Sequence, residues 1–270
     1  MENVSELLLR NEQSFKHPGI LLINPPRDAG FRMLSGDSRE VRLFTQDFGD
    51  YQWFLANGAS VEYGLIPGHL ADLSDVVLIQ PRERNRLDMM LHALAATSPP
   101  GRNIWLAGEI RTGIKSAGKN LANYFTRVSK TDNARHCVLY EAANPVKDKP
   151  FLLADYEQSW ALPAPWNDVK IVSLPGTFAH GKLDQGTRLL LDAMQEQAPR
   201  GRVLDFACGA GVVGLVLLAQ QADVDLTLLD TSALALESAQ RSLQTNECKA
   251  KLLPSDGLSE VDGRFDWIIS

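Results

Sequence analysis

The chain has 270 residues, of which 44% are hydrophobic and 22% charged, and 27 basic against 33 acidic side chains give a formal net charge of −6. This length holds one large domain or two, and a pI near 5.4 excludes a polybasic nucleic-acid coat. Three widely spaced cysteines, an acidic start and the lack of a long apolar run argue against secreted and membrane proteins, so we expect a cytoplasmic protein.

In the N-terminal half, short apolar runs alternate with amphipathic stretches. Buried strands are predicted at Ile20–Ile23, Val76–Ile79, Asn103–Ala107 and Cys137–Tyr140. Helical spacing of apolar residues covers Leu87–Ala96 and Lys115–Phe125. Such alternation favours a mostly parallel sheet with helices on both faces. The segment Glu141–Pro150, with two prolines and mixed charge, breaks the pattern and indicates a domain boundary.

A second alternation follows a connection rich in Pro and Trp. Helices are predicted at Thr187–Gln197, Val212–Gln220 and Ala233–Thr245. Strands are predicted at Val203–Phe206, Leu226–Leu229, Lys251–Leu253 and Phe265–Ile269. We therefore predict two tandem α/β domains, over residues 1–145 and 174–270, with a linker over residues 146–173.

The most informative segment is GRVLDFACGAGVVG, residues 201–214, in which a strand runs into a glycine-rich turn that opens a helix. Gly209, Gly211 and Gly214 spell G-x-G-x-x-G, and Asp230 follows near the spacing of a dinucleotide fingerprint, so a nicotinamide-dependent oxidoreductase is one hypothesis. Asp205, four positions before Gly209, favours another ligand, because a carboxylate is a poor neighbour for a pyrophosphate and a suitable one for the sulfonium and ammonium groups of S-adenosylmethionine.

A second cluster precedes this strand. Asp184 is predicted to cap the helix that begins at Gly186 and Thr187, and the free N–H groups of that helix start could also face the amino-acid end of the donor. Asp256, in a turn after the third strand, is positioned to accept the adenine amino group, although such turns are common.

These segments together resemble the bacterial ribosomal RNA small subunit methyltransferase C family. The resemblance is carried by LPGTFAHGKLDQGTRLLL, VLDFACGAGVVGL, LTLLDTSALALESAQRSL and GRFDWIIS, and by RTGIKSAGKNL and RHCVLYEA in the N-terminal half. It implies two tandem Rossmann-like methyltransferase-type domains, the first a degenerate copy that assists folding and RNA binding. It also implies methylation of the exocyclic N2 of a guanine in 16S rRNA. Carried over residue by residue, the implied donor contacts are Phe178, Asp184, Gly186, Asp205, Cys208, Gly209, Gly211, Asp230, Ser232 and Asp256.

The resemblance ends at one point. The family continues after its fourth strand with Asn-Pro-Pro-Phe, which holds the acceptor base, whereas this sequence stops at Ile268-Ile269-Ser270. No catalytic residue is therefore assigned, and we expect the chain to be a fragment. Asn24-Pro25-Pro26-Arg27 follows a first strand rather than a fourth, and a turn is its expected role. A non-catalytic RNA-binding or chaperone-like protein that retains a donor pocket stays open as an alternative.

A local basic segment offers an RNA contact despite the acidic chain. Arg111, Lys115 and Lys119 are spaced four apart and would share one face of a helix, where a phosphate contact and a solvated surface are equally compatible with the pattern. The expected partner is 16S rRNA in the small ribosomal subunit, bound by a monomer without a metal ion.

Overall fold

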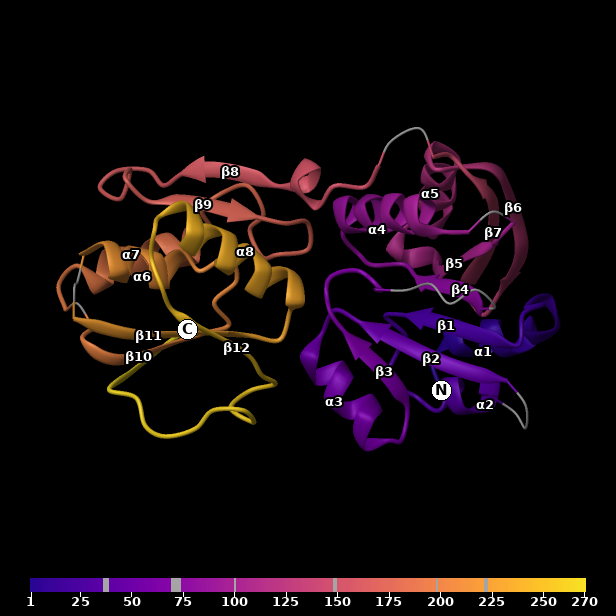
Figure 1. The fold of residues 1–270 in the computed structure, drawn as a ribbon, viewed down its shortest axis with the longest axis horizontal. Coiled ribbons are helices and arrows are strands. Elements are labelled where there is room, and N and C mark those ends of the chain that lie inside the picture. Colours follow the sequence, from indigo (N-terminus) through magenta and orange to yellow (C-terminus); the bar gives the residue numbers. More distant parts are fainter. Residues whose placement is uncertain (36–38, 69–73, 100, 148–149, 198, 221–222) are drawn as a thin grey trace. The chain divides into compact units, whose positions relative to one another are not determined.

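The computed structural model describes residues 1–35, 39–68, 74–99, 101–147, 150–197, 199–220 and 223–270, and the chain forms two compact units (Figure 1). The N-terminal unit comprises Met1–Gln46 and Asp50–Leu152, and the C-terminal unit Asp47–Gly49 and Leu153–Ser270. Within the described residues, no helix is long and apolar enough to cross a membrane.

The N-terminal unit contains a seven-stranded sheet of order β3-β2-β1-β4-β5-β7-β6. Its strands are β1 (Gly19–Ile23), β2 (Glu40–Thr45), β3 (Ser60–Tyr63), β4 (Ser74–Ile79), β5 (Ile104–Glu109), β6 (Phe125–Ala134) and β7 (Cys137–Pro145). The first five run parallel, and β7 and β6 are antiparallel to their neighbours. Its α-helices are α1 (Asn3–Arg10), α2 (Gly30–Ser35), α3 (Phe48–Ala56), α4 (Arg84–Thr97) and α5 (Ile114–Asn120).

Alternate residues of the central strands supply two separate cores, one on each face of this sheet. Leu21 and Ile23 of β1 pack with the side chains of α4 and α5, and Ile20 and Leu22 pack with those of α1, α2 and α3. All five residues of β1 are buried, as a central parallel strand requires. The predicted α/β layering of this half is therefore confirmed.

The C-terminal unit has a four-stranded parallel sheet of order β12-β11-β10-β13 and a two-stranded antiparallel hairpin. The sheet consists of β10 (Gly201–Phe206), β11 (Val224–Asp230), β12 (Lys251–Pro254) and β13 (Trp267–Ile269), and the hairpin of β8 (Gln158–Ala161) and β9 (Lys170–Ser173). Helices α6 (Gln185–Met194), α7 (Val212–Gln220) and α8 (Ala233–Thr245) lie together on one side of the sheet (Figure 1).

Two sequence predictions need correction. The helix predicted over Lys115–Phe125 ends at Asn120, because a 3-10 turn follows and Phe125 already begins β6. The break predicted from Glu141 begins later, because β7 stays paired with β6 as far as Pro145; Asp148 and Lys149 of that segment lie outside the described residues. The strands β2, β3, β6, β8 and β9 and the helices α1, α2 and α3 were not predicted.

Candidate functional site

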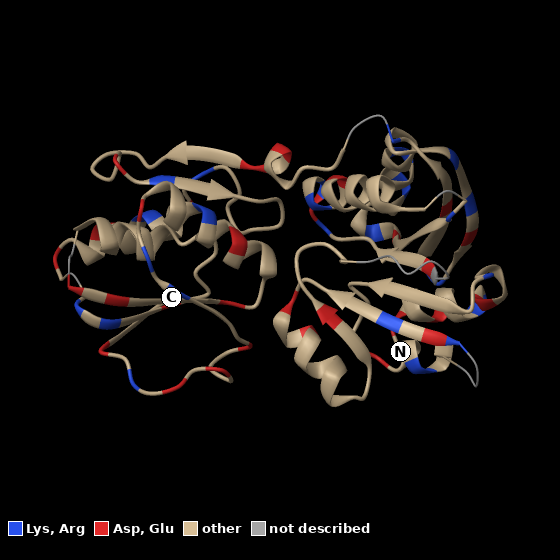
Figure 2. Ribbon diagram, in the orientation of Figure 1, with Lys and Arg blue, Asp and Glu red and all other residues tan. Residues whose placement is uncertain are grey.

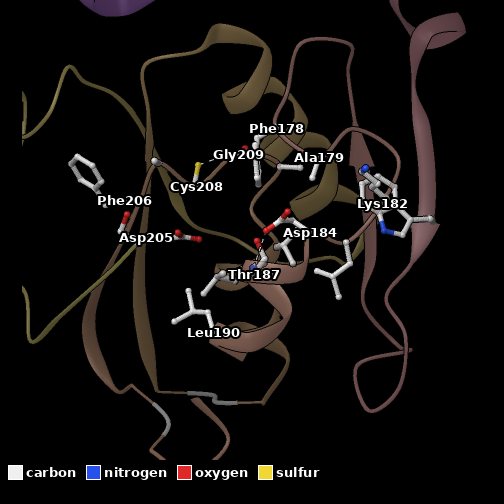
Figure 3. A pocket seen from close by; sticks show the side chains of 17 residues that line it. Phe178, Ala179, Lys182, Asp184, Thr187, Leu190, Asp205, Phe206, Cys208 and Gly209 are labelled. Atoms are coloured by element: carbon white, nitrogen blue, oxygen red, sulfur yellow. Dashed lines mark hydrogen bonds between the residues drawn. The ribbon is translucent and has the colours of Figure 1, made fainter. Parts of the chain in front are cut away.

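A cavity of about 190 Å³ opens at the carboxyl end of β10, between the start of α6 and the glycine turn (Figure 3). Parallel α/β sheets bind their ligands at this edge, beside the point where the strand order reverses. In this sheet the reversal lies between β10 and β13. The lining residues are Trp160, Phe178, Ala179, Lys182, Leu183, Asp184, Thr187, Leu190, Asp205, Phe206, Ala207, Cys208, Gly209, Ala210, Val212, Val213 and Ser270.

The turn after β10 needs glycine for two different reasons. Gly209 and Gly211 have φ of +56° and +79°, a left-handed conformation that side chains rarely adopt. A Cβ on Gly209 would meet no protein atom within 4 Å, so the space above this residue is open to a ligand. A Cβ on Gly214 would lie 2.5 Å from Leu228 Cδ2, so that glycine allows α7 to pack on β11.

Asp205 is a buried acid that faces the cavity. Its side chain is 3% exposed, and its Oδ2 accepts a hydrogen bond from the Gly214 backbone N–H at 3.0 Å. The pKa of Asp205 is raised to about 7: burial is the largest cause, the Gly214 N–H opposes the rise, and the Asp230 charge adds to it. No basic side chain in the described part of the chain forms an ion pair with Asp205, so a positively charged ligand would relieve an unfavourable charge there.

Asp230 organises the opposite side of the glycine turn. Its Oδ2 accepts from the Gly209 N–H and its Oδ1 from the Ser232 N–H, both at 2.9 Å. Burial raises the pKa of Asp230, and these backbone donors oppose the rise. Ser232 in turn caps α8 through the Ala235 N–H. Exposed Asp256 follows β12, which pairs with β11, and thus stands at the same edge of the sheet.

Asp184 caps α6, as predicted. Its Oδ2 accepts from the Gly186 N–H at 2.8 Å and from the Thr187 N–H at 3.2 Å. Because Asp184 also lines the cavity, one carboxylate both starts the helix and adds negative charge beside Asp205. Figure 3 shows the two side chains pointing into the same space.

The ten expected donor contacts therefore divide into two groups. Phe178, Asp184, Asp205, Cys208 and Gly209 line the cavity itself. The residues Gly186, Gly211, Asp230, Ser232 and Asp256 are not among its lining residues but lie at adjoining strand and helix ends of the same unit. Cys208 is buried, and burial together with the nearby aspartates raises the pKa of its thiol well above the usual range, which fits a packing role and not that of a nucleophile.

Two cavity residues escaped the sequence analysis. Lys182, labelled in Figure 3, is exposed and brings the one basic side chain found among the residues lining this cavity. Trp160 of β8 lines the cavity, and its indole Nε1 is buried with no hydrogen-bond partner in the described structure. Lys182 lies in the segment already singled out, between Phe178 and Asp184. Nothing local to Trp160 signals its position, which depends on the pairing of β8 with β9.

The basic segment of the N-terminal unit is less uniform than its spacing suggested. Arg111 lies in the 3-10 turn Ile110–Thr112 before α5 and is ion-paired with Glu109. Lys115 and Lys119 lie on α5, and both are exposed. The helix face shared by all three residues, expected from the spacing, is therefore limited to the two lysines.

The strand order, the glycine turn and the acidic residues at the ends of β10 and β11 define the C-terminal unit as a Rossmann-like methyltransferase domain. Residues 5–160 match the family model "Methyltransferase small domain N-terminal", and residues 168–270 match "Methyltransferase small domain". The chain belongs to the ribosomal RNA small subunit methyltransferase C family.

Curated relatives of that name extend over the whole chain. The protein of Shewanella loihica is 34% identical over 273 residues, which cover 100% of this chain and 79% of the relative. The protein of Pseudoalteromonas atlantica is 36% identical over 277 residues, covering 97% of this chain and 77% of the relative. A solved T. thermophilus structure, described as a 16S rRNA N2 G1207 methyltransferase in complex with AdoMet and guanosine, matches with a TM-score of 0.85 at 23% identity over 99% of this chain and 73% of that one. The last match supports the fold.

Proposed function

We propose that the chain binds S-adenosylmethionine in the cavity of its C-terminal unit and transfers the methyl group to the exocyclic N2 of a guanine in 16S rRNA. The observation that carries this proposal is Asp205, a buried acid at a glycine turn that forms no ion pair with a basic side chain of the described residues. A cationic donor suits this position, whereas the pyrophosphate of a nicotinamide cofactor would face the carboxylates of Asp205 and Asp184.

The residues present fit the charges of the donor. Asp205 and Asp184 would face the positive groups of the donor, and the open space beside Gly209 would leave room for the donor molecule. Lys182 would pair with its α-carboxylate, and the buried indole N–H of Trp160 is a second donor available in the cavity. Asp230 would accept from the ribose hydroxyls and Asp256 from the adenine amino group, while Phe178, 70% exposed, would cover the lip.

When bound, the donor supplies a methyl group activated by positive sulfur, and transfer to nitrogen is a direct displacement that needs no metal ion. The chain's own part is to hold the donor by charge and shape and to keep the methyl group oriented toward the acceptor. No residue of the chain is assigned to the acceptor guanine. We further propose that the chain acts on the small ribosomal subunit as a cytoplasmic monomer. We also propose that residues 1–145 form a degenerate first domain and residues 174–270 the donor-binding domain, with a linker over residues 146–173.

Lys182→Met tests the binding mode by calorimetric titration. The variant is expected to bind S-adenosylhomocysteine about tenfold more weakly, because a charge-assisted hydrogen bond to the carboxylate is lost. Its affinity for 5′-methylthioadenosine, which lacks the amino acid, should stay within twofold of the parent (on the order of the ±0.5 kcal/mol typical of surface substitutions). The exposed Lys249→Met, outside the cavity lining, is the matched control.

Three further measurements decide between the functions. Binding of NAD in place of S-adenosylhomocysteine would contradict the methyltransferase proposal at its first step. Transfer of labelled methyl to 30S subunits, located on guanine N2 by nuclease digestion and mass spectrometry, would support it fully. Donor binding and rRNA binding without transfer would instead favour the non-catalytic RNA-binding alternative.

A further inference from the structure

The cavity of the C-terminal unit, here called the donor cavity, takes five of its lining residues from one segment, residues 174–184. These are Phe178, Ala179, Lys182, Leu183 and Asp184. The segment connects β9 to α6 and contains no helix or strand. Its shape must therefore come from turns and from contacts with neighbouring elements.

Successive turns fold this segment. The backbone N–H groups of Thr177, His180 and Lys182 each donate to the carbonyl three residues earlier, at 3.2, 3.2 and 3.0 Å. Ala179, between the first two of these residues, has φ of +53°, a left-handed conformation that is unfavourable for a residue with a Cβ. Contacts from outside the segment are therefore needed to hold it in this shape.

The side chain of Ser173, the last residue of β9, supplies such a contact. Ser173 is fully buried, and its Oγ accepts from the Gly181 N–H at 3.1 Å and lies 2.7 Å from His180 Nδ1. Burial lowers the pKa of His180, which favours the neutral imidazole, and a neutral ring can accept the Ser173 O–H at Nδ1. One buried hydroxyl thus contacts two consecutive residues of the segment.

These two contacts lie immediately before Lys182. A Cβ on Gly181 would overlap Gln158 Oε1, so the backbone at Gly181 lies directly against β8. The strands of the hairpin carry one charged residue, Lys170 at the start of β9 (Figure 2). Lys182 is exposed and forms no ion pair with any of the described residues. The hairpin therefore holds the segment by neutral contacts, and the charge of Lys182 is left available to a ligand.

We propose that His180 is a positioning residue for donor binding: its hydrogen bond to Ser173 fixes the turn before Lys182 and so directs the Lys182 ammonium group to the α-carboxylate of the donor. The inference rests on the proposed donor and on its pairing with Lys182. His180 is not among the residues that line the cavity, so its effect must pass through a residue that is. A fixed backbone suits this task, because a lysine on it loses less conformational freedom when it pairs with a ligand.

His180→Ala tests the proposal in the full chain by calorimetric titration with two ligands. The variant is expected to bind S-adenosylhomocysteine about fivefold more weakly, because Lys182 is still present but no longer held in place. Its affinity for 5′-methylthioadenosine, which has no carboxylate, should stay within about twofold of the parent. His136→Ala, at an exposed histidine of the N-terminal unit, is the control, and it is expected to leave both affinities unchanged.

Two further variants separate positioning from a general effect on the fold. His180→Asn keeps a polar group near the place of Nδ1 and is expected to restore S-adenosylhomocysteine binding to within about twofold of the parent. When His180→Ala is added to Lys182→Met, binding is expected to weaken by less than about twofold further, because the residue to be positioned is already gone.

The outcomes are distinct. Equal losses for the two ligands, no recovery with His180→Asn, or the full loss in the Lys182→Met background would each overturn the role given to His180. If the parent binds S-adenosylhomocysteine and His180→Ala binds it equally well, this inference alone is refuted. Binding of NAD and not of S-adenosylhomocysteine by the parent would refute the proposed function, and this inference with it.

Discussion

Burial is the largest cause of the raised pKa of Asp205. Its pKa of about 7 in the folded chain exceeds the ordinary 3.8, so folding favours the protonated acid. This contribution to the free energy of unfolding is complete below pH 4 and is lost as the pH rises through 7. Asp205→Asn is expected to remove that pH dependence and to make the chain more stable than the parent at pH 8, with similar stability near pH 4. Urea unfolding from pH 4.5 to 8 measures it.

The same variant separates stability from binding. The amide of Asp205→Asn would keep an oxygen to accept from the Gly214 N–H but would carry no charge toward a cationic ligand. Affinity for S-adenosylhomocysteine is expected to fall roughly tenfold or more at pH 8, while stability there rises. A parallel loss of both quantities, or unchanged binding, would contradict the role given to the carboxyl group.

Ala207 carries backbone strain beside the cavity. Its φ is +59°, and this left-handed conformation costs a residue with a Cβ about 1–2 kcal/mol. Ala207→Gly is expected to stabilise the chain by about 0.5–1 kcal/mol, because relief of the strain exceeds the added flexibility of the unfolded chain. Thermal and urea unfolding measure it. The control is Ala219→Gly at an exposed position of α7, where the free energy of unfolding is expected to fall by about 1 kcal/mol. A change of the same sign at both positions would refute the explanation.

At the level of elements, two buried serines attach α8 to β9. Ser242 Oγ accepts from the Val172 N–H at 2.9 Å and donates to the Val172 C=O at 3.0 Å. Ser238 Oγ accepts from the Leu174 N–H at 3.0 Å and contacts Thr177 Oγ1 at 2.9 Å. The two serine hydroxyls of α8 thus form hydrogen bonds with backbone groups at the edge of β9 that does not pair with β8. They also hold the segment that leads into the cavity.

Ser242→Ala is therefore expected to lower the free energy of unfolding by about 1–3 kcal/mol, because both backbone groups of Val172 become buried without partners. Ser159→Ala on β8, where the serine is exposed, is the control with an expected change within about 0.5 kcal/mol. Urea denaturation of the two variants checks the difference. Similar small effects at both positions would mean that water replaces the lost hydroxyl.

The spacing of apolar residues correctly predicted the helices and strands whose pattern lies within one continuous segment of the sequence. The ranges of α7 and α8 match the predictions, and Asp184 was identified as the cap of α6. The strand β2 was missed because its first half is not buried and carries Arg42. The helix after Lys115 was extended too far, because the apolar spacing continues through the 3-10 turn Leu121–Asn123 to Phe125, which begins β6.

The residues of the candidate site also divide into those signalled by a local sequence pattern and those whose position depends on the fold. Asp205, Gly209 and Asp230 could be proposed from the sequence because their spacing around a strand and a glycine turn is a local pattern. The cavity role of Trp160 could not be predicted, since it arises from the hairpin that sets β8 near the site. The family resemblance gave the chemistry, and the structure adds how the charges are arranged around it.

For the whole molecule, the donor proposal assigns binding to one of the two units. The proposed donor contacts all lie in the C-terminal unit, and in the N-terminal unit the buried Gln46 follows β2 and is hydrogen-bonded to Arg86 and Asn24. Saturation with S-adenosylhomocysteine at 100 times its dissociation constant stabilises its binding unit by about 2.7 kcal/mol. Hydrogen exchange measured by mass spectrometry is expected to slow in residues 201–230 and to stay unchanged in residues 19–23 and 104–109. Equal protection of both sheets would contradict the assignment, and Asp205→Asn should reduce the effect at the same ligand concentration.

The charge of Asp205 also bears on turnover. Methyl transfer turns a positively charged sulfonium into a neutral thioether, so Asp205 would lose part of the favourable charge that it faces once the reaction is complete. If the donor binds as proposed, the product would therefore have one favourable charge interaction fewer with Asp205 than the donor has.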